Sequence, residues 1–278
     1  MTLYLQPKSV DEAVQALSEN SLFVLAGGTD YYPARVGKPL NDDILDITGI
    51  TDLRGITEND DHFHIGALTR WTDVIETRLP DYFDGLKLAA REVGGVQIQN
   101  AGTIAGNICN ASPAADGVPP LLALDAKVEL TSASRGTRVL ALSEFIQGVR
   151  KTALCDDELM TAILIPRPPT QARSAFEKLG NRRYLVISIS MVAATITCDS
   201  DGRIVDARVA VGACSPVAQR LSHLECDLIG NTVQDIKITE EHFASLSPID
   251  DVRGSAPYRL DVVAEQCVRA IKRAAGHE

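Results

Sequence analysis

The chain has 278 residues, of which 45% are hydrophobic and 23% charged, and its formal net charge is −10 at pH 7. This is the composition of a globular protein long enough for one large domain or two modest ones. The negative charge argues against broad binding to nucleic acid or anionic lipid, because phosphate binding needs clustered lysine and arginine. No apolar run approaches the roughly 18–20 residues of a membrane span, and the N-terminus lacks the features of a secretory signal.

The six cysteines are scattered along the chain, and no two are close neighbours in sequence. Iron–sulfur and zinc sites usually include at least one closely spaced pair. We therefore expect no metal in this chain. Scattered cysteines in an acidic chain also favour reduced thiols, and hence a cytoplasmic location.

The first half of the chain alternates helical and strand patterns. Residues 9–20 predict a helix, because Ser9 and Glu12 form a capping box ahead of a helically spaced apolar stripe. Residues 22–26 predict a buried strand that ends at Gly27 and Gly28. Further strands are expected at 43–47 and 63–68, and a helix at 86–93. The long Gly- and Asn-rich stretch 94–116 lacks periodicity, and loops of that length are usually functional.

The pattern changes in the second half. Strands are expected at 127–130, 137–141 and 159–165, with a short helix at 143–149. Prolines 166, 168 and 169 place a domain boundary near residue 170. Beyond it, 187–198 and 203–214 flank a good hairpin turn, and helices are expected at 215–229, at 240–246 and at the C-terminus. This predicts a small antiparallel sheet covered by helices, an α+β fold.

Two segments have residues suited to holding an anion. The first is Ala26-Gly27-Gly28-Thr29-Asp30, directly after a strand, and the second runs from Ala101 to Asp116. Glycines let backbone N–H groups converge on a phosphate, and Thr and Asn add short donors. A diphosphate can be held by many amide dipoles with little help from Lys or Arg.

These glycines do not match the other common phosphate-binding motifs, and each segment also has a simpler structural interpretation. No third glycine follows at the Rossmann spacing, and no phosphate-binding P-loop motif is present. By itself, the pair Gly27 and Gly28 is more typical of a β-turn, and the second segment could be a plain surface loop. Asp116 could cap a helix that begins near Pro119.

Taken in order, five fragments resemble the FAD-binding subunits of molybdenum hydroxylases, a family that includes the medium subunit of carbon monoxide dehydrogenase and the flavin domain of xanthine dehydrogenase. The fragments cover nearly the whole chain. They are residues 4–13, the AGGTD loop at 26–30 with TIAGN at 103–107 and NASPAAD at 110–116, residues 157–166, residues 176–183 and residues 250–259.

The resemblance implies a two-part FAD-binding domain of the PCMH (vanillyl-alcohol-oxidase-like) type at 1–170, with subdomains at about 1–55 and 56–170. An α+β domain of the CO dehydrogenase flavoprotein C-terminal type follows at 171–278. It also implies an FAD contact at each matching position. Ala105 stands where the family usually has a second glycine, and its methyl fits if φ is negative there. The implied cofactor-binding residues are Ala26, Gly27, Gly28, Thr29, Asp30, Thr103, Ile104, Ala105, Gly106, Asn107, Asp116, Met160 and Lys178.

Of these positions, 26–30 and 103–107 match loops on the diphosphate. Asp116 matches an acceptor for the sugar hydroxyls, Met160 meets the flavin ring through its backbone, and Lys178 lies close to that ring. The segment 180–189 matches a loop at the edge of the ring.

A flavin carries the redox chemistry, so no catalytic acid–base pair or nucleophile is expected in this chain. The resemblance implies partners: a large molybdopterin subunit that oxidises the substrate and a small 2Fe–2S subunit that relays electrons to this FAD. The three chains would form a heterotrimer or a dimer of heterotrimers that reduces an external acceptor. Two alternatives remain at this point. One is a free-standing FAD-dependent oxidase or dehydrogenase of the same fold, and the other is a binding module that has lost FAD.

Overall fold

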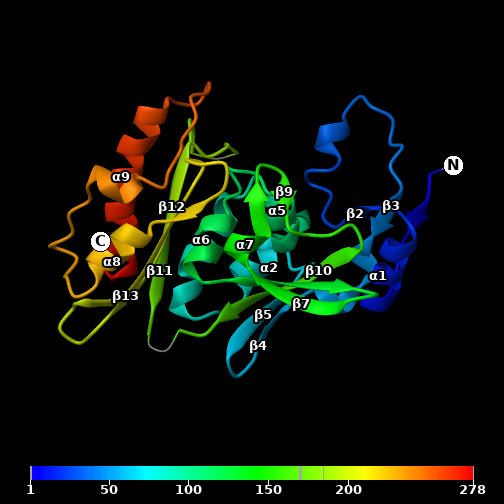
Figure 1. Ribbon diagram of the computed structural model, residues 1–278, viewed down its shortest axis with the longest axis horizontal. Coiled ribbons are helices and arrows are strands. Elements are labelled where there is room, and N and C mark those ends of the chain that lie inside the picture. Colours follow the sequence, from blue (N-terminus) through cyan, green and yellow to red (C-terminus); the bar gives the residue numbers. More distant parts are fainter. Residues whose placement is uncertain (1, 169–170, 184, 278) are drawn as a thin grey trace.

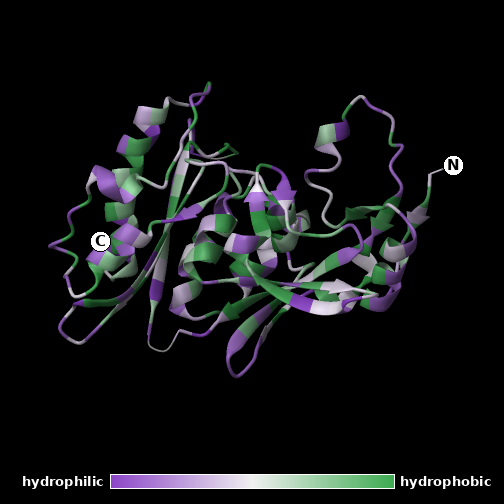
Figure 2. Ribbon diagram, viewed as in Figure 1, coloured by the Kyte–Doolittle hydropathy of each residue, from purple (hydrophilic) through white to green (hydrophobic). Residues whose placement is uncertain are grey.

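The structure is a computed structural model that describes residues 2–168, 171–183 and 185–277. Three sheets follow one another along an elongated molecule (Figure 1), with the N-terminal sheet at one end and the two last helices at the other. Figure 2 shows hydrophobic residues gathered along the strands of the central and C-terminal sheets, whereas the outer hairpin tips are hydrophilic. The predicted α+β class is confirmed. The boundary predicted at residue 170 lies outside the described residues.

The N-terminal sheet is parallel and small. Its strand order is β1 (Tyr4–Leu5), β3 (Ile44–Asp46), β2 (Phe23–Leu25). Helix α1 (Val10–Glu19) begins where predicted, because Ser9 Oγ accepts a hydrogen bond from Glu12 N. The predicted capping box is not closed, since Glu12 accepts from Lys8 N and not from Ser9 N. Its buried face packs on Leu45 and on Leu159 of the central sheet, so this unit is fastened to its neighbour through apolar contacts.

The central sheet is antiparallel, with helices packed against one of its faces. Its strand order is β4 (Ile56–Glu58), β5 (His62–Gly66), β10 (Glu158–Pro166), β6 (Lys127–Ser132), β7 (Gly136–Ala141). The helices are α2 (Trp71–Glu76), α3 (Asp84–Glu92), α4 (Val96–Ala101), α5 (Ile104–Cys109) and α6 (Val118–Ala123). Phe63, Ile65 and Ile163 of the sheet share one core with Trp71 and Leu86 of the helices.

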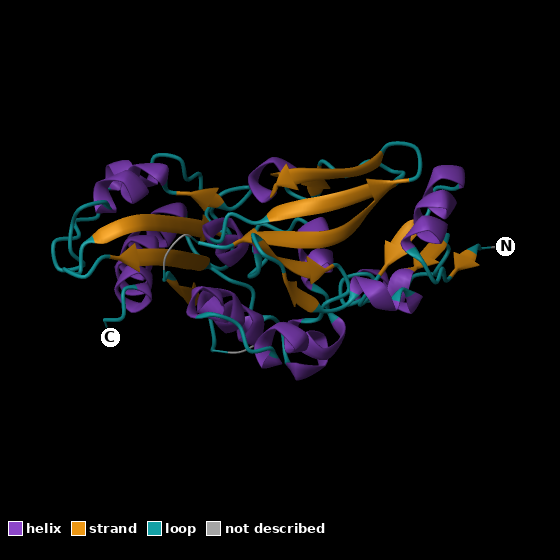
Figure 3. Ribbon diagram, turned by 90° about the horizontal axis from the view of Figure 1, so that it is seen from below, coloured by secondary structure: helices purple, strands orange, loops and turns teal. Residues whose placement is uncertain are grey.

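The C-terminal sheet is buried on both faces. Its antiparallel strands are β11 (Arg173–Leu179), β12 (Ser190–Cys198), β13 (Ile204–Gly212) and β14 (Gln219–Arg220). Along β12, Met191 and Ala193 join the core of the central layers, whereas Val192 and Ala194 face the other way. On that outer face lie α8 (Ser222–Leu228) and α9 (Ala256–Ala274), as Figures 1 and 3 show. The two-residue side-chain period of a strand explains this division.

Four local predictions need correction. The stretch 94–116 is not one irregular loop, because it contains α4 and α5, each too short to give an apolar period. The helix expected at 143–149 ends early as α7 (Leu142–Phe145), and the chain turns into β8 (Ile146–Gly148), which pairs with β9 (Lys151–Thr152). In 215–229 only α8 is helical. The segment 240–246 forms a short 3₁₀ turn, Glu240–Phe243.

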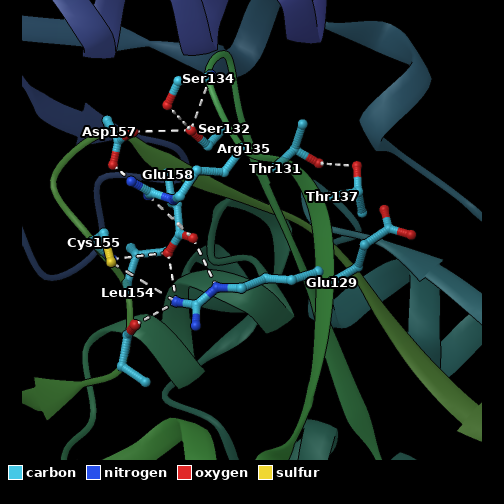
Figure 4. A network of polar contacts seen from close by, with 12 residues as sticks. Glu129, Thr131, Ser132, Ser134, Arg135, Thr137, Leu154, Cys155, Asp157 and Glu158 are labelled. Atoms are coloured by element: carbon cyan, nitrogen blue, oxygen red, sulfur yellow. Dashed lines mark hydrogen bonds and ion pairs between the residues drawn. The ribbon is translucent and has the colours of Figure 1, made fainter.

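A polar network holds the ends of β6, β7 and β10 together (Figure 4). The side chain of Glu158 is almost fully buried, and Arg138 donates two hydrogen bonds of 2.7 Å to its carboxylate. The N–H of Cys155 donates to the same carboxylate at 2.9 Å. Beside it, Asp157 pairs with Arg135 and accepts from Ser132 Oγ. These donors favour the ionised form, so the pKa of Glu158 is lowered although burial opposes the shift.

Replacing Glu158 with Gln should lower the free energy of unfolding by roughly 1–3 kcal/mol at pH 7, since one charge-assisted pair is lost. A depressed pKa stabilises the fold above the ordinary value of 4.5, and this contribution is lost as the pH falls further. Urea titrations should therefore show the gap between wild type and E158Q narrowing below that pH. The exposed Glu144→Gln is the control, and an equal loss in both variants would contradict the prediction.

Candidate functional site

Two glycine loops meet at the middle of the molecule. The first glycine loop, residues 26–30, follows β2, and the second glycine loop, residues 101–107, leads into α5. At Gly27 a Cβ atom would lie 2.0 Å from the carbonyl oxygen of Ala101, so no other residue fits without displacing backbone. Gly28 has a φ of +69°, which also favours glycine. The loops are thus in direct contact, although many residues separate them in sequence.

Backbone donors of both loops are unused. Within the described residues, the N–H groups of Gly27, Gly28 and Thr29 donate to no other protein group, and the same is true of Thr103 and Ala105. The short helix α5 explains part of this, because the first N–H groups of a helix lack intrahelical acceptors. Unused N–H groups from two loops in contact make a concave surface suited to an anion.

A groove of about 720 Å³ runs past both loops. Its lining includes Phe23 and Tyr31 from the N-terminal part of the chain and Asp116, Leu185 and Ile187 from later parts. Asn107 also lines it and has a buried Oδ1 atom with no hydrogen-bond partner among the described residues. A buried polar atom without a partner is costly, so this atom indicates a position for a ligand donor.

A second cavity, of about 840 Å³, lies behind the same loops and shares Ala26, Gly27 and Thr103 with the groove. The ion pair between Arg54 and Asp73, 2.7 Å long, lines its wall.

A buried ion pair lies beside the groove, which Asp116 lines. Lys178 Nζ in β11 lies 2.7 Å from Asp116 Oδ2, and their side chains are only 6% and 11% exposed. Ser188 Oγ donates to Asp116 Oδ1 at 2.6 Å, and Lys178 also donates to the carbonyl of Glu92 at 3.2 Å. Burial raises the pKa of the Asp116 carboxyl, and the Lys178 charge opposes that rise.

Most of the sequence-predicted positions share this groove. Those that line it are Ala26, Gly27, Gly28, Thr29, Asp30, Thr103, Gly106, Asn107 and Asp116. Four do not. The side chains of Ile104 and Ala105 point into the core from α5, and Met160 is also in the core, its sulfur 3.9 Å from that of Cys109. Lys178 reaches the groove only through Asp116.

Two local expectations are decided by this geometry. Ala105 lies in helix α5 with no positive φ, so its methyl group is accommodated in the core. Asp116 does not cap the helix near Pro119: α6 begins after Gly117, and no side-chain hydrogen bond caps it. The Asp116 carboxylate is instead held by Lys178 and Ser188.

Sequence reasoning missed several groove residues. Trp71, Cys109 and Arg150 line the groove, and Arg150 is held by Asn110. None of them carries a local motif, and they come together only because separate turns fold onto the same surface. Among the described residues, no group of three or more His, Cys, Asp and Glu side chains is arranged to hold a metal ion. No helix among them is long and apolar enough to cross a membrane.

Comparison with known proteins gives two family matches. Residues 1–168 match a family described as the FAD binding domain in molybdopterin dehydrogenase, and residues 174–274 match the CO dehydrogenase flavoprotein C-terminal domain.

Among curated proteins, the chain is 36% identical over 209 residues to the nicotinate dehydrogenase FAD-subunit of Eubacterium barkeri, covering 72% of this chain and 70% of that protein. It is 31% identical over 283 residues to the xanthine dehydrogenase FAD-binding subunit of Escherichia coli O157:H7, covering 98% and 95%. A solved chain of the carbon monoxide dehydrogenase from Hydrogenophaga pseudoflava superposes with a TM-score of 0.87 at 28% identity, covering 98% of this chain and 96% of that one.

Replacing Lys178 with Met should leave the Asp116 carboxylate buried without its cation, which costs about 3–5 kcal/mol of stability. The pKa of Asp116 should then rise further, and a raised carboxyl pKa makes stability fall as the pH rises. Urea denaturation should therefore show a larger loss at pH 8 than at pH 5.

The double variant K178M/D116N should be less destabilised than K178M alone, because the buried charge is gone. The exposed Lys127→Met is the matched control. A K178M variant as stable as this control would contradict the buried pair.

Proposed function

This chain belongs to the FAD-binding medium subunits of the molybdenum hydroxylase family, which are parts of multi-subunit oxidoreductases, and we propose that its groove holds FAD along the two glycine loops. The observation that carries this proposal is the contact between Gly27 and Ala101, which joins two loops that line one groove and whose N–H groups include several without a protein acceptor among the described residues. When bound, FAD accepts and donates electrons, so the protein has to supply binding and orientation.

The residues of the groove fit such a cofactor. The N–H groups at 27–29 and at Thr103 and Ala105 would hold the diphosphate, whose negative charge matches their dipoles. The unpartnered Oδ1 of Asn107 would accept from a hydroxyl of the cofactor. Asp116 would accept from sugar hydroxyls, since each of its oxygens has a second lone pair free of the bonds to Lys178 and Ser188.

We assign the flavin ring to the end of the groove that is lined by Asp116, Leu185 and Ile187. The Met160 backbone and the Lys178 ammonium would lie near it, and the Lys178 charge would oppose the rise that burial causes in the pKa of Asp116. Leu185 and Ile187 line this end and are more than half exposed, so the ring would lie close to the protein surface. Electrons can reach and leave a flavin there without passing through the core.

We further propose a chain of electron transfer from a 2Fe–2S subunit through this FAD to an external acceptor, with substrate oxidation on a molybdopterin subunit. A heterotrimer, or a dimer of heterotrimers, in the cytoplasm is the assembly that we propose. Family matches that end at residue 168 and resume at residue 174 support two domains, 1–170 and 171–278.

Gly27→Ala should abolish or strongly weaken FAD binding, because the added methyl collides with backbone and moves one loop off the other. We expect at least about a hundredfold rise in the Kd for FAD, measured by quenching of flavin fluorescence, which corresponds to the loss of two charge-assisted hydrogen bonds. Gly148→Ala is the control, since the nearest atom to its Cβ would be 3.8 Å away. Equal affinities in the two variants would refute the proposed diphosphate site.

Co-expression with the neighbouring reading frames tests the assembly. A tagged chain should retain one partner whose visible spectrum is that of 2Fe–2S clusters and another that contains molybdenum. Sedimentation would give the stoichiometry. A chain that purifies alone and is reduced directly by an organic substrate would contradict the proposal and favour a free-standing oxidase.

A further inference from the structure

The connection between β11 and β12 is bonded to the FAD-binding half at both of its ends through the carboxylate of Asp116. Lys178 precedes this connection and Ser188 lies near its end, and both bond to the carboxylate of Asp116. Ser188 is 2% exposed, so its hydroxyl cannot exchange this partner for bulk water. The carboxylate of Asp116, which lies between α5 and α6, therefore bonds to both ends of the β11–β12 connection of the C-terminal sheet.

A second contact fixes the backbone next to Ser188. The guanidinium of Arg259, at the start of α9, donates to the carbonyl of Ile189, and Arg259 is itself paired with Asp251 at 2.7 Å. Ser188 and Ile189 are thus held from opposite sides, one by the FAD-binding half and one by α9. Leu185 and Ile187, which line the groove, precede this fixed point directly.

We propose that Ser188 is a positioning residue of the FAD site, acting through Asp116. Its hydroxyl sets the rotation of the carboxylate and keeps Leu185 and Ile187 in place in the wall of the groove. This inference rests on the proposed function, because it assigns FAD to that groove.

The geometry explains why Lys178 alone does not do this. A carboxylate turns easily about its terminal torsion, and the Lys ammonium is a compact charge with no directional fork. One such contact leaves the plane of the carboxylate free, whereas a second bond on the other oxygen fixes it. The two remaining lone pairs then point in a defined direction, which a cofactor hydroxyl requires.

The chain offers a matched control two residues further on. Ser190 is also fully buried and donates to a side-chain oxygen, Gln266 Oε1, at 2.7 Å, but this bond joins β12 to α9 outside the groove. Ser188→Ala and Ser190→Ala remove the same hydroxyl from the same chain. Thermal melting of both variants reports on the general cost of the lost bond.

Three measurements test the role of Ser188. The Kd for FAD should rise about tenfold in S188A, as expected for losing one bond to a charged group, and should not change in S190A. Iodide should quench the fluorescence of bound FAD more strongly in S188A than in wild type or S190A. Arg182 is exposed in the β11–β12 connection. In protein without FAD, trypsin should cleave after Arg182 faster in S188A than in wild type, and S190A should be cleaved at the wild-type rate.

A double-mutant cycle with Asp116→Ala shows whether Ser188 acts through that carboxylate. In the D116A background, S188A should add nothing to the trypsin rate. If S188A binds FAD like wild type, or if it speeds cleavage equally in both backgrounds, the inference is wrong while the proposed FAD site stands. If the wild-type chain binds no FAD, the proposed function fails and this inference fails with it.

Discussion

The contact between Gly27 and the carbonyl of Ala101 is the constraint on which the site depends. It allows two loops from different parts of the fold to present their free N–H groups side by side. A side chain at Gly27 would separate them, because backbone cannot give way as a flexible side chain can. An anion site made of amide dipoles also explains how a chain with a net charge of −10 can hold a diphosphate.

The C-terminal sheet contributes to the site because one of its two covered faces packs against the FAD-binding half. One face joins the central core through Met191 and Ala193, and this packing places Lys178 of β11 beside Asp116. The ion pair is buried, so its loss is costly, and it couples the two halves of the chain. The end of the groove proposed for the flavin is therefore built from both halves, and neither half would complete it alone.

This division of labour suits an electron-transfer subunit. In the proposed arrangement the groove binds and orients FAD, and the flavin would lie near the surface, where Leu185 and Ile187 are exposed. The catalytic chemistry of the family is spread over several subunits. This chain therefore needs a rigid cofactor-binding site that leaves one edge of the flavin accessible. Substrate choice would then be set on another chain.

Local chemistry in the sequence determined the Ser9 cap of α1, the α+β class and the two glycine loops, because capping, alternation and glycine runs are readable within a few residues. It also pointed to Asp116 and Lys178, through resemblance. Only the tertiary structure decided that the loops touch, that Asp116 caps no helix, that Trp71 and Arg150 line the same groove, and that Ser188 bonds to Asp116. These contacts join residues that are far apart in the chain. Such contacts depend on how the layers pack, which local sequence patterns do not indicate.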